Sequence, residues 1–237
     1  MIISRLRLKN WRNFSKLDVL LRQRQFIVGP NASGKSNLLD VFRFLRDIAK
    51  SEGGGLQKAV KNHGGLSKIR CLSARRDPEI IVDVELAEAM DTEPVWCYSL
   101  GIDRERAENG QFRLSFERVW KKGRVILDRP NQEDENDPER LQQTFLEQIN
   151  TNGEFREIVR FFDAIGYVHL IPQLLRHTEF TQGGIVEDDP FGQGLLLKIS
   201  KTDAQTRTAR LNKLEEALKI TVPQLQQLRF ERVEETG

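Results

Sequence analysis

The sequence has few residues of the kinds that build disulfide frameworks or zinc sites. Its 237 residues include two cysteines, Cys71 and Cys97, and three histidines, His63, His169 and His177. No C-x-x-C pair occurs, and no histidine stands at metal-ligand spacing from another ligand. We therefore expect two reduced, partly buried thiols and no zinc site.

Long apolar runs and an excess of either charge are also missing. No run approaches membrane-spanning length, and Met1–Arg5 is not followed by the apolar core of a signal peptide. The 37 basic and 35 acidic residues leave a net charge of +2, which excludes a polycationic arm but permits a local basic face. We expect a cytoplasmic protein without a membrane partner, folded as one large or two small domains.

One motif, Gly29–Ser36, reads GPNASGKS and fits the pattern G-x-x-x-x-G-K-[ST] without a substitution. Its glycines let backbone N–H groups surround a polyphosphate, and the helix that follows favours anions at its N-terminus. Lys35 would reach the β- and γ-phosphates of ATP, and the Ser36 hydroxyl would ligate Mg²⁺. The predicted ATP-binding residues are Gly29, Pro30, Asn31, Ala32, Ser33, Gly34, Lys35, Ser36 and Asn37.

The residues around this loop predict its setting. Alternating apolar residues over 2–8 and again over 17–21 indicate a β-hairpin, and Phe26-Ile27-Val28 predicts a buried strand that enters the loop. After the loop, apolar residues at spacings of three and four between Leu38 and Ala49 predict an amphipathic helix, which ends before Gly53-Gly54-Gly55. A strand before the loop and a helix after it disfavour the alternative, a glycine turn with an accidental lysine.

The remainder predicts a mixed α/β chain. Three alternating runs, at 80–86, 95–102 and 112–120, indicate an antiparallel meander. Residues 129–140 are acidic and contain two prolines, which indicates a linker. Helical spacing predicts helices over 141–165, divided at Asn152-Gly153, and over 206–220. Short strands are predicted at 167–171 and 228–233. The predicted domains are therefore a core lobe over 1–128, an acidic linker over 129–140 and a helical segment with a final strand over 141–237.

The N-terminal residues resemble a known family. Leu-x-Leu-Lys-Asn-Trp-Arg-Asn-Phe at 6–14, followed by GPNASGKSN at 29–37, is similar to ABC-type ATPases of the SMC and RecF group. It is most similar to the stand-alone AAA-type ATPases related to OLD nucleases and bacterial anti-phage systems. Asn31 and Asn37 separate this loop from those of GTPases and small-molecule kinases. The resemblance is specific over the first fifty residues and weaker beyond them.

The resemblance implies a P-loop NTPase fold of the ABC/SMC head type. It implies ATP and Mg²⁺ as ligands, and an antiparallel β subdomain beside the nucleotide base. It further implies that an arginine between the first two strands approaches the nucleotide, and Arg12 holds the matching place; an exposed turn residue is the alternative. Gln57 is a candidate for the glutamine that senses Mg²⁺ in ABC proteins.

The groups that hydrolyse ATP in this family have no clear counterparts here. Asp83 and Asp128 each end an apolar run, but neither is followed by the glutamate of an Asp-Glu pair. Thr181–Gly184 resembles an ABC signature only faintly, because an acidic segment ending in Pro190 follows it instead of a helix. We therefore leave the catalytic residues unassigned and expect the chain to correspond to the N-terminal part of such an ATPase, incomplete at its C-terminus.

Two functions follow as hypotheses. The first is an ATPase domain in a nucleic-acid-linked process, such as phage defence or DNA repair, in which ATP drives a conformational switch or the assembly of a homodimer or higher oligomer through the nucleotide face. The second is an assembly scaffold that binds ATP without hydrolysing it and partners an effector protein. A small-metabolite kinase fits less well, since such kinases do not begin with this hairpin and meander. The candidate basic face for nucleic acid, with ordinary solvated surface as its alternative, comprises Arg22, Arg24, Lys61, Lys68, Arg70, Arg75, Arg76, Lys121, Lys122 and Arg124.

Overall fold

The computed structural model describes residues 1–73, 79–106, 112–169 and 194–231. It divides the chain into two compact units, Met1–Gly166 and Tyr167–Gly237. We describe each unit by itself.

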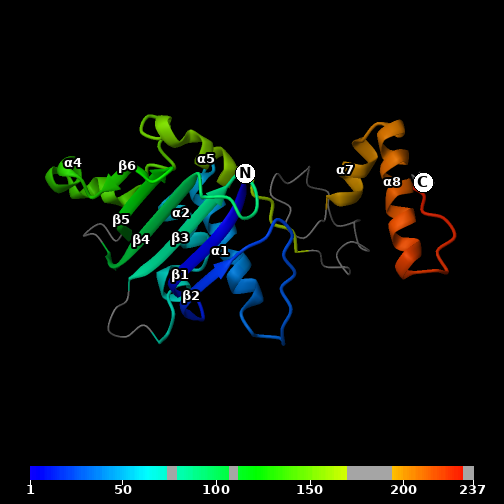
Figure 1. Cartoon of the computed structure of the whole chain (residues 1–237), viewed down its shortest axis with the longest axis horizontal. Helices are drawn as coiled ribbons and strands as arrows, with labels where there is room; N and C mark the ends of the chain where they lie inside the picture. Colours follow the sequence, from blue (N-terminus) through cyan, green and yellow to red (C-terminus); the bar gives the residue numbers. More distant parts are fainter. Residues whose placement is uncertain (74–78, 107–111, 170–193, 232–237) are drawn as a thin grey trace, which may run out of the picture. The chain divides into compact units, whose positions relative to one another are not determined.

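The first unit contains a six-stranded antiparallel sheet (Figure 1). Its strands, in the order β2-β1-β3-β4-β5-β6, are β1 (Ile2–Trp11), β2 (Phe14–Leu20), β3 (Ile80–Ala87), β4 (Trp96–Arg106), β5 (Phe112–Lys121) and β6 (Arg124–Arg129). The register pairs Leu6 with Val19 in β2 and with Val84 in β3. The predicted hairpin and meander are confirmed, and β6 adds a strand that the sequence analysis did not identify.

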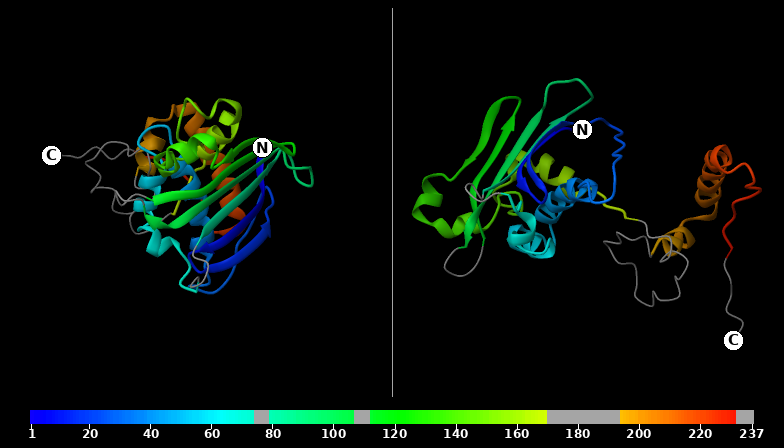
Figure 2. Two further views of the ribbon diagram at one scale, coloured as in Figure 1. Left: turned by 90° about the vertical axis from the view of Figure 1, so that its left-hand side faces the viewer. Right: turned by 90° about the horizontal axis from the view of Figure 1, so that it is seen from below.

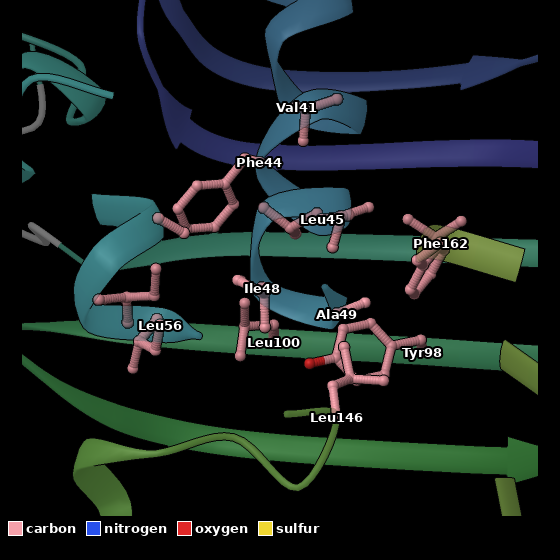
Figure 3. Packing of buried hydrophobic residues seen from close by; sticks show 14 of the residues in the cluster. Val41, Phe44, Leu45, Ile48, Ala49, Leu56, Tyr98, Leu100, Leu146 and Phe162 are labelled. Carbon is pink, nitrogen blue, oxygen red and sulfur yellow. The ribbon is translucent and has the colours of Figure 1, made fainter. Parts of the chain in front are cut away.

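Alternation along the strands gives the sheet one apolar and one polar face. Helices α1 (Lys35–Ala49), α2 (Leu56–Asn62), α3 (Leu66–Ile69) and α5 (Arg156–Asp163) supply the other side of a single core. Figure 2 shows α1 and α5 on one face of the sheet. In Figure 3, Phe44, Leu45 and Ile48 of α1 lie among Tyr98 and Leu100 of β4, all of them buried. The apolar stripe predicted for 38–49 is therefore the core face of α1.

The strand predicted to enter the loop is not formed. Residues 25–30 have no regular structure, and Phe26, Ile27 and Val28 are 78%, 36% and 93% exposed. An apolar run becomes a strand only where another strand pairs with it. β2, the strand that precedes residues 25–30 in the chain, lies at the edge of the sheet and pairs with β1. The mixed α/β class is correct, but the described residues contain no parallel sheet around the loop.

The linker predicted over 129–140 is also wrong, because the segment is folded. Asn131 caps helix α4 (Gln132–Asn136) with a reciprocal hydrogen bond from the Asn131 backbone N–H to Asp134. A 3₁₀ turn, η1 (Pro138–Gln142), follows. Asp134 is buried and ion-paired with buried Arg129, whereas the other acidic residues of the segment are exposed, as their composition indicated.

The predicted helix over 141–165 is correct only in its second half. Residues 143–151 are irregular, and a 3₁₀ turn, η2 (Gly153–Phe155), leads into α5. In the first half, Glu117 of β5 accepts hydrogen bonds from the backbone N–H groups of Phe145 and Leu146. These bonds satisfy the backbone in place of helical partners.

The second unit contains helices α7 (Leu195–Lys201) and α8 (Ala204–Thr221). Asp203 caps α8 by accepting a hydrogen bond from the Thr206 N–H, and α8 confirms the predicted helix at 206–220. Neither helix has a buried residue within the described part of the chain. Residues 167–169 and 228–231 form no strand. Residues 170–171, 181–184 and 232–233 lie outside the described residues.

Among the residues that the structure describes, no helix is long and apolar enough to cross a membrane.

Candidate nucleotide site

The Gly29–Ser36 loop is closed around the side chain of its own lysine. The Lys35 ammonium donates hydrogen bonds to the carbonyl oxygens of Gly29, at 2.7 Å, and Pro30, at 2.6 Å. Except for Gly34 and Lys35, the loop residues are exposed. A phosphate that enters the loop would compete with these two carbonyl oxygens for the ammonium.

Space for a side chain is limited at two glycines of the loop. Gly34 has a φ of 99°, and a Cβ there would lie 2.5 Å from the Asn13 side-chain nitrogen. A Cβ on Gly29 would come within 3.0 Å of the Ser33 hydroxyl. Gly34 therefore needs glycine, both for its left-handed backbone and for space, whereas a side chain on Gly29 would require the exposed Ser33 hydroxyl to move aside.

Helix α1 begins at Lys35, directly after the loop. Its first intrahelical backbone bond runs from the Leu38 N–H to the Gly34 carbonyl oxygen. The N–H groups of Lys35, Ser36 and Asn37 precede that bond, and the first N–H groups of a helix are available to an anion. The residues present fit a polyphosphate, with the Ser36 hydroxyl placed in the same turn to ligate Mg²⁺.

The turn between β1 and β2 is docked against the start of α1. The Trp11 indole donates to the Asn37 carbonyl at 2.9 Å, and the Asn37 amide donates to the Asn13 side-chain oxygen at 2.8 Å. Asn13 thus contacts both Gly34 and Asn37. Sequence analysis overlooked Asn13, although it lies within the Asn-Trp-Arg-Asn-Phe stretch that carries the family resemblance.

Arg12 faces α1 and is not an exposed turn residue. The Nε and Nη2 atoms of its guanidinium both donate to one carboxylate oxygen of Asp40 in α1. Its Nη1 donates to the Lys68 carbonyl oxygen at 3.4 Å. Burial disfavours ionised Asp40, but hydrogen bonds from His63 and Arg12 outweigh this and hold the pKa of Asp40 below its usual value. Whether Arg12 also contacts a nucleotide stays a prediction.

An open cavity of about 650 Å³ lies beside the start of α1. Basic and amide side chains, from Arg12, Asn13, Asn37, Lys68 and Arg70, form much of its wall, together with Ser67, Cys71, Leu72 and Ser73. No carboxylate is among these lining residues. Such a wall suits the base and ribose of a nucleotide whose phosphates lie in the adjoining loop.

The other candidates for catalytic groups lie away from the loop. Asp83 alternates with buried Val82 and Val84 in β3, so it is on the sheet face opposite α1, where it accepts a short hydrogen bond from Ser99. Asp128 pairs with Arg118 at 2.8 Å on β6 and β5. Neither is placed to hold a metal at Ser36.

Gln57 acts as a structural bridge. Its amide nitrogen donates to the carbonyl oxygens of Phe112 and Gln142, each at 2.8 Å, and its oxygen accepts from the Phe112 N–H. Both ends of the amide are occupied, which argues against the Mg²⁺-sensing role considered from the sequence.

The chain matches both a model of a known family and a known protein. A family model described as "AAA domain, putative AbiEii toxin, Type IV TA system" matches residues 26–230. The DNA replication and repair protein RecF of Agathobacter rectalis is 34% identical over 88 residues, which cover 36% of this chain and 24% of that protein. The chain thus matches about a quarter of the length of this relative.

Proposed function

Since this chain belongs to the family of AAA domains described as putative AbiEii toxins of type IV toxin–antitoxin systems, we propose that it binds ATP and Mg²⁺ at the Gly29–Ser36 loop. It is an AAA ATPase domain related to RecF and the ABC ATPases, families in which nucleotide binding is expected. The loop closed around Lys35, with no room for a side chain at Gly34, is the observation that carries the proposal.

The ligand would extend from this loop over the β1–β2 turn. Lys35 and the first N–H groups of α1 would hold the phosphates, and Ser36 would ligate Mg²⁺, which neutralises phosphate charge. The base and ribose would occupy the cavity lined by Arg12, Asn13 and Arg70. The basic side chains of this wall also favour the approach of an anionic nucleotide, whose phosphates would lie in the loop.

Bound ATP would act as a switch by joining two copies of the protein through the nucleotide face, in a process linked to nucleic acid such as phage defence or DNA repair. The exposure of most of the loop supports this, because a partner can reach a phosphate held there. Lys61 and Lys68 are exposed and Arg70 is half-buried, with Lys68 and Arg70 in the wall of the cavity, while Arg75 and Arg76 lie outside the described residues. The polar face of the sheet supports nucleic-acid binding less, since Arg5, Arg7 and Arg118 are paired there with carboxylates.

A nucleotide-dependent scaffold that does not hydrolyse ATP is the second candidate. It is favoured by the position of Asp83 and Asp128 away from the loop and by the use of Asp40 in pairs with Arg12 and His63. The exposed Phe26-Ile27-Val28 segment beside the loop supports a protein partner that covers it. In this candidate the partner would be the effector protein that the scaffold holds.

The deciding experiment measures binding of a fluorescent ATP analogue, and phosphate release, by the purified chain with Mg²⁺. Lys35→Ala is the test variant, and Lys16→Ala, on edge strand β2, is a matched loss of one positive charge away from the loop. We expect Lys35→Ala alone to weaken binding by at least tenfold, because it removes the ammonium that contacts the phosphates.

Each outcome has a meaning. Binding of the analogue without phosphate release would support the scaffold. Phosphate release that is lost in Lys35→Ala would support the ATPase. Sedimentation with and without the analogue then tests whether ATP joins two copies. No binding by the folded wild-type chain would overturn the proposed function.

A further inference from the structure

His63, the residue that follows α2, forms a buried bridge between two carboxylates of α1. Its Nδ1 lies 3.0 Å from an oxygen of Asp40, and its Nε2 lies 3.1 Å from an oxygen of Asp47. The imidazole has no exposed surface. Asp40 and Asp47 are seven residues apart, so they lie two turns apart on the same side of α1.

The chemistry of imidazole restricts the protonation state of this bridge. A neutral imidazole has one N–H and can donate to only one carboxylate, so its other nitrogen would direct a lone pair at an anion. Both carboxylates are also held by guanidinium groups, Asp40 by Arg12 and Asp47 by Arg46. Two ionised carboxylates at hydrogen-bond distance from both ring nitrogens call for an imidazolium.

The bridge is continuous with the start of the phosphate loop's helix. The ring of Phe44 stands edge-on to His63 with centroids 5.3 Å apart, and it also packs on Trp11 at 5.1 Å. Trp11 in turn donates to the carbonyl of Asn37. A shift of His63 would therefore reach α1 both through Asp40 and through this aromatic stack.

We propose that doubly protonated His63 is a positioning residue, which ties α2 to α1 and holds the helix that presents Lys35 and Ser36 in its nucleotide-binding position. This rests on the proposed nucleotide site. The charged groups that face the bridge are Asp40, Asp47 and Arg46 of α1 and Arg12 of the β1–β2 turn. Loss of the His63 proton leaves both carboxylates competing for one N–H.

This bridge is sensitive to pH. Burial lowers the pKa of His63, but hydrogen bonds to Asp40 and Asp47 outweigh it and raise the pKa above 6.5. Stability from the bridge is therefore complete below about pH 6.5, the value of the unfolded chain, and is lost as pH rises through the higher folded-state pKa. Nucleotide affinity should fall over the same range.

The test compares the wild-type chain with Asp47→Asn and His63→Gln. In Asp47→Asn, the amide nitrogen can donate to Nε2, so a neutral imidazole still bridges both residues while the need for a second proton disappears. Nitrogen-detected NMR of the histidine rings at pH 7, assigned to His63 by comparison with His63→Gln, reports the number of ring protons. Melting temperature and affinity for the fluorescent ATP analogue are followed from pH 6.5 to 9.

We expect protons on both His63 ring nitrogens at pH 7. Relative to Asp47→Asn, the wild-type chain should lose about fivefold in analogue affinity across this range, the lower end of typical coupling, and should lose melting temperature more steeply. A single ring proton at pH 7, or equal pH slopes of melting in the two proteins, would overturn the proposal. If the analogue does not bind at all, the proposed function fails, while the ring protons and the melting curves still decide whether the bridge exists.

Discussion

At the scale of single residues, Gly34 is the most constrained position in the loop. It combines a φ of 99° with an Asn13 amide in the space where a Cβ would lie. Gly34→Ala should lower stability by about 1–3 kcal/mol and abolish ATP-analogue binding, because the loop must move away from the β1–β2 turn. Urea unfolding and analogue titration measure the two effects.

Gly65 provides a matched control for this substitution. Its φ is 87°, but nothing lies within 4 Å of a Cβ placed there. Gly65→Ala should therefore carry the cost of the backbone conformation alone and leave analogue binding intact. Adding Asn13→Ala to Gly34→Ala should recover part of the lost stability, and equal effects of the two glycine substitutions would contradict the steric explanation.

Arg129 is a second residue whose surroundings determine how strongly its substitution should lower stability. All five of its N–H donors are used, by Glu117, by both oxygens of Asp134 and by the carbonyl oxygens of Gln143 and Arg140. Its side chain is fully buried. Arg129→Met should destabilise the chain by about 3–5 kcal/mol, because it leaves buried Glu117 without its cation and Asp134 with Arg140 alone, at 3.5 Å.

The control for Arg129 is Arg118, which pairs with Asp128 on the surface, where both side chains are well exposed. Arg118→Met should cost under about 1 kcal/mol, since water and salt screen exposed pairs. Denaturant unfolding of both variants gives the comparison. A similar loss in the two would mean that the buried network adds little to stability.

At the scale of elements, Glu147 joins the irregular segment 143–151 to helix α2. Its carboxylate accepts a hydrogen bond of 2.6 Å from the Leu56 N–H and lies against Gly55. Burial is the main cause that raises the pKa of Glu147 to about 7. The folded state therefore holds this proton more tightly than the unfolded chain does.

This pKa gives a prediction for the dependence of stability on pH. Stability from protonated Glu147 is present below about pH 4.5 and is lost as pH rises through about 7. Glu147→Gln keeps an oxygen for the Leu56 N–H and cannot ionise, so it should stabilise the chain by about 2 kcal/mol at pH 8 relative to wild type, and by little at pH 5. Melting temperatures across this range test it, and Glu154→Gln, on an exposed residue, is the control.

At the scale of the whole molecule, the buried core belongs to one of the two units. Every buried residue of the hydrophobic cluster lies between Leu6 and Phe162, and helices α7 and α8 contain none. A chain of residues 1–166 should therefore fold cooperatively and melt within a few degrees of the full chain. Differential scanning calorimetry of both tests this, and a failure of the shorter chain to fold would show that the second unit stabilises the first.

Local pattern was enough to predict the elements whose partners lie nearby in the chain. Residues that alternate over 2–8 and 17–21 formed a hairpin, and the strands from 80 to 120 paired with their sequence neighbours. The apolar stripe on α1 and the loop motif could also be predicted from the sequence, since helical spacing and glycine requirements are local properties.

Distant partners decided the rest. Phe26–Val28 has the composition of a strand but no strand beside it, and Asp134 is buried because Arg129 of β6 reaches it. The contacts of Asn13 with Gly34 and of His63 with Asp40 and Asp47 join residues 16 to 23 positions apart. The sequence by itself determined the loop at which we propose that phosphate binds, because one continuous segment supplies the donors. Only the tertiary structure decided which side chains brace that loop, because burial and ion pairing depend on neighbours that the chain brings together by folding.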